Sequence, residues 1–98
     1  MVRALLINPM DNVAVALADI PANTDVTILD GTERTQVKSL QNISFAHKIA
    51  IRTITKGDAI LKYGVPIAVA ISEIATGEWV HVHNAKSYLE PVREAHKP

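Results

Sequence analysis

The sequence contains no cysteine, few aromatic residues and no excess of charge of either sign. Without cysteine there is no disulfide framework, no thiolate metal ligand and no cysteine nucleophile, as is typical of proteins in a reducing compartment. Ten basic and ten acidic residues cancel, so no long-range field draws the chain to nucleic acid. Because aromatic residues make up only 4% of the chain, aliphatic side chains must fill the core.

Long hydrophobic runs are also missing. The longest apolar stretches fall far short of the roughly 20 residues that a membrane span needs. The N-terminal segment has one basic residue and a short apolar run before Asn8 and Pro9, unlike a signal peptide. No nucleophile elbow, phosphate loop or dinucleotide fingerprint is present. We therefore expect a cytoplasmic protein that binds neither a membrane nor nucleic acid.

Short apolar runs, in which β-branched residues recur at alternate positions, are the main pattern of the sequence. They lie at residues 13–17, 26–29, 49–52 and 80–83. This period predicts half-buried strands, and the closely spaced turn residues between the runs predict a compact, mainly β (all-β) fold, a barrel or a clip. The segment 12–20 is also compatible with a short helix because of its alanines, but we favour a strand.

A weak internal repeat supports this interpretation. Ile, two linker residues, a turn residue, two more residues and a branched aliphatic residue occur at Ile20–Val26, Ile54–Ile60 and Ile74–Val80. The turn position is Asn or Gly, which adopt a positive φ most readily. The unequal spacing of the copies argues against a solenoid. We expect the same corner to be used three times in an interwoven β fold.

The chain has room for one core, which we place in residues 1–86. Residues 87–98 are polar, contain Pro91 and alternate in charge sign. We expect this tail to be either a short terminal helix or a linker toward another domain.

Three of the four histidines lie in two places, His47 in one and the pair His81 and His83 in the other. If 80–83 is a strand, both imidazoles of the pair lie on one face. Two imidazoles suit Fe, Zn, Mn or Ni, but a third ligand must come from His47 or from an acid of a partner. The alternative is a strand at a barrel mouth whose polar side chains only face solvent.

Lys62 and Tyr63 stand at the end of a predicted strand, before a glycine turn. The lysine could pair with a substrate carboxylate and the tyrosine could donate a proton, or both could simply pack over a barrel end. Lys48 and Arg52 are anion contacts or a solvated edge. Trp79 is expected to pack in the core or at an interface, with its N–H hydrogen-bonded. These polar residues are too few for a whole active site, and we therefore expect a partner.

Several motifs, in order, resemble the SAF domain of the altronate/galactarate dehydratase family, which is also similar to the small subunit of sulfolactate sulfo-lyase. They are DNVAVALADI at 11–20, HKIAI at 47–51, I-T-K-G-D at 54–58, KYG-V-PI at 62–67 and GEWVHVHN at 77–84. Each motif alone is weak, and the five together, from about residue 11 to about residue 84, carry the resemblance.

The resemblance implies a β-clip fold and a part in removing water from a sugar acid such as altronate, giving a 2-keto-3-deoxy acid. It implies Fe²⁺, with Mn²⁺ or another divalent metal as alternatives, and a large catalytic subunit or domain as partner; a homo-oligomer is also open. The rival hypotheses are the sulfolactate sulfo-lyase small subunit and a non-catalytic module for carbohydrate-acid binding or assembly.

The resemblance also implies roles for individual residues. It assigns catalysis to His47 and Tyr63, substrate binding to Lys48, Lys62 and Asn84, and metal binding to His81 and His83. Two departures concern glycines of the family, which are replaced here by Ala46 and Ala68. If those glycines have positive φ, the alanines strain the backbone.

Overall fold

The computed structural model describes residues 2–87, and these residues form strands and no helix. The strands are β1 (Val2–Leu5), β2 (Val13–Ala16), β3 (Asp25–Asp30), β4 (Glu33–Lys38), β5 (Lys48–Ala50), β6 (Ala59–Lys62), β7 (Val65–Ala70), β8 (Trp79–Val80) and β9 (Ala85–Ser87). The predicted all-β fold is confirmed, as is the preference for a strand over a helix within 12–20. Among these residues, no helix has the length and apolar character to cross a membrane.

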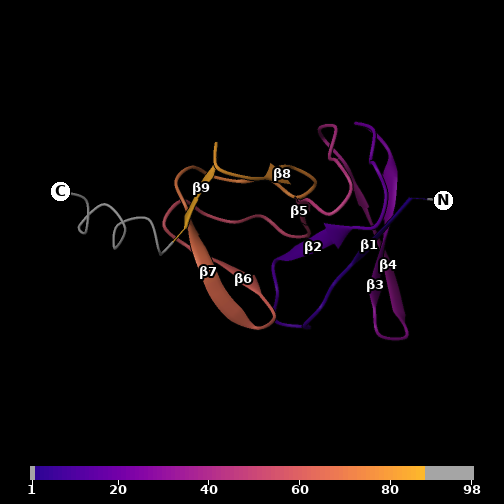
Figure 1. The fold of residues 1–98 in the computed structure, drawn as a ribbon, viewed down its shortest axis with the longest axis horizontal. Coiled ribbons are helices and arrows are strands. Elements are labelled where there is room, and N and C mark those ends of the chain that lie inside the picture. Colours follow the sequence, from indigo (N-terminus) through magenta and orange to yellow (C-terminus); the bar gives the residue numbers. More distant parts are fainter. Residues whose placement is uncertain (1, 88–98) are drawn as a thin grey trace.

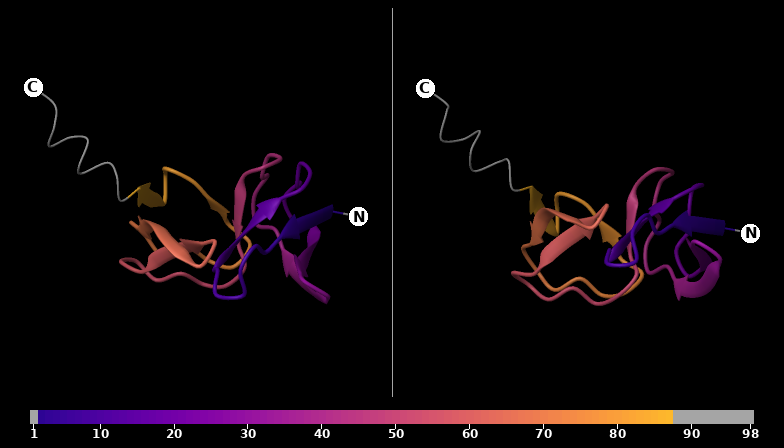
Figure 2. Two further views of the ribbon diagram at one scale, coloured as in Figure 1. Left: turned by 60° about the horizontal axis from the view of Figure 1, so that its bottom comes forward. Right: turned by 90° about the horizontal axis from the view of Figure 1, so that it is seen from below.

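The strands form two sheets. One has the order β4-β3-β1-β2-β5-β8 and the other the order β6-β7-β9. β1 and β3 are parallel, and the remaining neighbours are antiparallel. In Figure 1, β6, β7 and β9 lie at one end of the molecule, β1, β3 and β4 at the other, with β2, β5 and β8 between them. Figure 2 shows the same division from two further sides.

The three predicted corners are confirmed by their backbone. The turn residues Asn23, Gly57 and Gly77 have φ values of 60°, 92° and 94°. Each donates its N–H to a strand or loop carbonyl at 2.8 Å. The positive φ therefore serves one purpose in every copy, which is to aim the turn's N–H at a neighbouring segment before the chain enters a strand.

A fourth corner, which the sequence pattern did not reveal, spans Ile43 to Ile49. Its turn residue is Ala46, whose φ is 72° and whose N–H donates to the carbonyl of Ala16 at 2.8 Å. The strain expected at Ala46 is therefore present. The strain expected at Ala68 is absent, because Ala68 lies within β7 and is not among the described residues with positive φ.

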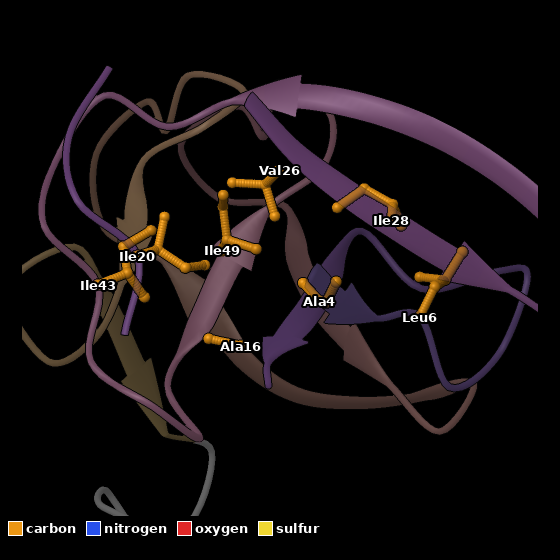
Figure 3. Packing of buried hydrophobic residues seen from close by; sticks show 9 residues of the cluster. Ala4, Leu6, Ala16, Ile20, Val26, Ile28, Ile43 and Ile49 are labelled. Atoms are coloured by element: carbon orange, nitrogen blue, oxygen red, sulfur yellow. The ribbon is translucent and has the colours of Figure 1, made fainter. Parts of the chain in front are cut away.

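The corners meet in pairs and divide the core in two. Ile20 bridges to Ile43, and Ile54 bridges to Ile74. Around the first pair lies a cluster of Ala4, Leu6, Ala14, Ala16, Ile20, Val26, Ile28, Ile43 and Ile49, seen in Figure 3. Around the second lies a cluster of Val13, Ala50, Ile54, Ile60, Ala68, Ala70, Ile74 and Val80. We call these the first and second halves of the domain.

The predicted tail, residues 87–98, falls outside the described residues except for Ser87, which belongs to β9.

Candidate functional site

An aromatic cluster forms where the two halves meet. β5 pairs with β8, with Lys48 opposite Val80. This pairing places the His47 ring 5.7 Å from the Trp79 ring, measured between centroids. The ring of His81 stacks on Trp79 at 4.9 Å with an interplanar angle of 11°, and the ring of His83 lies 5.0 Å away. The structure thus brings together all three histidines that the sequence singled out.

The turn that carries His81 and His83 differs from the prediction. β8 ends at Val80, and residues 81–84 form a turn, so the predicted strand over 80–83 is wrong from His81 onward. Asn84 is the physical reason: its Oδ1 accepts the N–H of His81 at 2.9 Å, and its Nδ2 donates to the carbonyl of Trp79 at 2.8 Å. Asparagine favours such local side-chain bonds, which compete with strand pairing.

Asn84 is buried, and both ends of its amide bond the backbone of the turn. This makes Asn84 a positioning residue for His81 and Trp79. Its predicted contact with substrate stays a prediction.

The three histidines do not by themselves fit a metal centre. Within residues 2–87 no group of three His, Asp or Glu side chains is placed to hold a metal ion. The Nδ1 atom of His47 is taken by the indole N–H of Trp79 at 3.0 Å. His81 and His83 are exposed, so an ion bound there needs further ligands from elsewhere.

Two lysines, Lys48 and Lys62, lie beside this cluster, and within residues 2–87 neither has an acidic partner. The pKa of Lys48 is lowered because burial desolvates its ammonium group and because the charge of Lys62 repels it. Among the described residues no carboxylate forms an ion pair with either lysine. Lys62 instead places its Nζ 5.3 Å from the centre of the Tyr63 ring. An anion bound between the two ammonium groups would offset their mutual repulsion.

Lys48 and His81 also belong to the wall of an open groove of about 620 Å³. The other lining residues, mostly apolar, are Ile60, Pro66, Ile67, Ala68, Val80, Val82, Ala85 and Ser87. The groove lies against the second sheet, and its charged side is the side toward the histidine cluster.

The hairpin that carries Lys62 and Tyr63 is held by a buried carboxylate. Tyr63 and Gly64 have φ values of 59° and 71°, as in the two-residue turn that suits a β-hairpin. Asp11 is fully buried, and its two oxygens accept the N–H of Tyr63 at 3.0 Å and of Gly64 at 2.7 Å. The Tyr63 side chain itself is 62% exposed.

Asn12 extends this clamp along the same hairpin. Its Oδ1 accepts the N–H of Leu61 at 2.8 Å, and its Nδ2 donates to the carbonyl of Ala59 at 2.9 Å. Arg52, a predicted anion contact, donates to the carbonyl of Asp11 at 2.9 Å. The sequence analysis gave Asp11 and Asn12 no role of their own; the signal that could have found them is a polar pair directly before a buried strand.

Comparison with known proteins adds an independent finding. The family model described as the altronate/galactarate dehydratase SAF domain matches residues 2–88. The altronate dehydratase of Escherichia coli K12 is 42% identical over 83 residues, which is 85% of this chain and 16% of that protein. The altronate dehydratase of Bacillus subtilis is 36% identical over 87 residues, or 89% and 17% respectively.

A third relative is the (2R)-sulfolactate sulfo-lyase subunit alpha of Chromohalobacter salexigens. It is 35% identical over 60 residues, which is 61% of this chain and 64% of that subunit. The chain thus spans about a sixth of the length of the altronate dehydratases and a larger share of a separate small subunit.

Proposed function

Because this chain belongs to the family of altronate/galactarate dehydratase SAF domains, we propose that it is the accessory part of a sugar-acid lyase. The matching segment is only 16% and 17% of the two altronate dehydratases, so most of each of those proteins lies outside it. In the sulfo-lyase the matching protein is a separate subunit. The partner proposed here is accordingly a large catalytic domain or subunit.

The observation that carries this proposal is the unpaired lysine pair. A sugar acid presents a carboxylate, and its dehydration removes a proton from the carbon beside that group, so negative charge grows on the carboxylate oxygens. Lys48 and Lys62 would hold the carboxylate and offset this charge. Burial and, second to it, the charge of Lys62 lower the pKa of Lys48, and a bound anion would offset both effects.

The remaining predicted residues surround this pair. Tyr63 presents its phenol at the hairpin tip beside the Lys62 ammonium, and His47 lies next to Lys48 in the chain. His81 and His83 are proposed to give two ligands to a divalent ion, Fe²⁺ in the first instance, that the catalytic partner completes. Such an ion would supply positive charge near the substrate oxygens. A cytoplasmic location is part of the same proposal.

The test is reconstitution. This chain and a candidate large subunit are assayed alone and together with Fe²⁺, for 2-keto-3-deoxy acid from altronate and galactarate and for sulfite from sulfolactate. We expect product only from the mixture. The double variant Lys48→Met/Lys62→Met should lower kcat/KM about 100-fold, whereas Lys56→Met, at an exposed corner, should leave it unchanged.

Two outcomes separate the alternatives. Release of sulfite in place of the dehydration product would identify the sulfo-lyase branch, the alternative supported by the match to a sulfo-lyase subunit alpha. If no mixture forms product while the large subunit is shown to be competent, the chain is a non-catalytic binding or assembly module.

A further inference from the structure

A side-chain hydrogen bond determines which nitrogen of His47 carries its proton. The indole Nε1 of Trp79 lies 3.0 Å from Nδ1 of His47. Indole N–H is a donor and never an acceptor. Nδ1 must therefore present a lone pair, and the proton of the neutral imidazole must sit on Nε2. A doubly protonated ring would set two N–H groups against each other.

Trp79 is itself held on both sides. Its backbone N–H donates to Oε1 of Gln41 at 2.8 Å, and its carbonyl accepts from Nδ2 of Asn84 at 2.8 Å. Its ring is covered by the stacked ring of His81. The indole that faces His47 is thus anchored by segments from 38 residues upstream and 5 residues downstream.

We infer that Trp79 is a positioning residue that holds His47 as the neutral tautomer with its proton on Nε2. His47 then acts as a hydrogen-bond donor to a substrate oxygen and neither accepts nor relays a proton. The tautomer rests on the geometry alone, and the role toward substrate rests on the proposed function.

The chemical consequence is that His47 and the base of the elimination are different groups. A neutral donor stabilises charge that grows on an oxygen during the elimination, and it costs no proton transfer at that step. To accept a proton at Nε2, His47 would first have to lose the one it carries there. The lone pair of Nδ1 already accepts the indole N–H of Trp79. The base of the elimination must then be another group.

The first experiment is NMR on the ¹⁵N-labelled chain. In metal-free buffer we expect a scalar coupling across the hydrogen bond between Trp79 Nε1 and His47 Nδ1, and a single His47 tautomer. Trp79→Phe keeps a ring against His81 but removes the N–H, so the coupling should vanish and both tautomers should appear. An Nδ1 that carries the proton in the wild-type chain would overturn the inference.

The second experiment uses the reconstituted enzyme. His47→Gln keeps an N–H donor near the Nε2 position, whereas His47→Ala keeps none. A donor role predicts that kcat falls less than about tenfold in the first and about 100-fold in the second, with little change in KM. Equal abolition of activity in both variants would mean that His47 transfers a proton, contrary to the inference.

The two proposals fail separately. If the coupling is present but no mixture turns over any of the acids, the tautomer stands and the proposed function falls. If turnover is present but the coupling is absent, the proposed function stands and the inference falls.

Discussion

The two halves of the domain use the same corner twice each, but they hold its turn position with different residues. At the corners of the first half the positive-φ residues are Asn23 and Ala46, and at the corners of the second half they are Gly57 and Gly77. Each half closes its own apolar cluster through an Ile–Ile bridge. The first half therefore has a side chain at both of its turn positions, and the second half has none.

The comparison also explains where the candidate site lies. The corner at Ala46 is followed by His47 and then by β5, which begins at Lys48, and the corner at Gly77 leads into β8, which begins at Trp79. β5 and β8 pair with each other. The histidine cluster therefore belongs to neither half alone, because it is built on one strand from each half.

The sharpest test of the difference is a matched pair of glycines. Gly57 and Gly77 have nearly equal φ, but an added Cβ at Gly57 meets nothing within 4 Å, whereas at Gly77 it overlaps the carbonyl oxygen of Lys38. We expect Gly77→Ala to lower the free energy of unfolding by about 3 kcal/mol or more, and Gly57→Ala by about 1 kcal/mol. Urea denaturation measures both, and equal losses would show that φ alone governs the corners.

A second test concerns the link between the halves. Asp11, before β2, holds the hairpin tip of the second half through the N–H groups of Tyr63 and Gly64. Asp11→Asn replaces one acceptor by a donor and should cost about 2 kcal/mol, while Asp58→Asn, at an exposed corner, should cost less than about 0.5 kcal/mol. Hydrogen exchange should quicken at the Tyr63 and Gly64 amides first. A uniform increase over the whole chain would argue against a local clamp.

A third test uses the lysine at the junction. The pKa of Lys48 is lowered in the folded chain, so between that value and the ordinary 10.5 the unfolded chain binds more protons than the folded chain. The free energy of unfolding therefore rises with pH across that window. At lower pH the charged ammonium of Lys48 destabilises the folded chain by its full amount.

Lys48→Met should accordingly raise the melting temperature at pH 7 by a few degrees and flatten its pH dependence toward pH 10.5. The exposed Lys56→Met is the control and should change neither. A lower melting temperature for Lys48→Met would mean that the ammonium stabilises the fold.

The smallest expected effect comes from the one alanine at a corner. Ala46→Gly removes the strain of a positive φ but adds freedom to the unfolded chain, for a net gain of about 0.5 kcal/mol. Ala68→Gly, within β7, has no such strain to relieve and should lose about 1 kcal/mol. Thermal unfolding of both variants separates the two cases by sign.

Local patterns predicted much of this fold. Alternating β-branched residues reveal strands because side chains of a strand alternate between faces, and Asn23, Gly57 and Gly77 mark corners because few residues accept positive φ. The fourth corner escaped because alanine at position 46 carries no such mark. The strand over 80–83 failed because Asn84 bonds the backbone of its own turn.

Features of the site that depend on distant partners could not be predicted in the same way. Histidines 47, 81 and 83 were singled out by residue type, but their gathering around one indole follows from the pairing of β5 with β8. The role of Asp11 depends on backbone groups 52 and 53 residues further along the chain. No local pattern contains such information.

The long reach of the Asp11 clamp has a consequence for how the protein folds. A large loop must close, at a cost in chain entropy, before residues 11 and 64 can form their hydrogen bond. Domains dominated by such long-range contacts fold in milliseconds to seconds. During synthesis the clamp cannot form until the hairpin has left the ribosome. The hairpin tip that carries Lys62 and Tyr63 should therefore be fixed late, so that a chain truncated before residue 63 would lack the clamp even if its first half had collapsed.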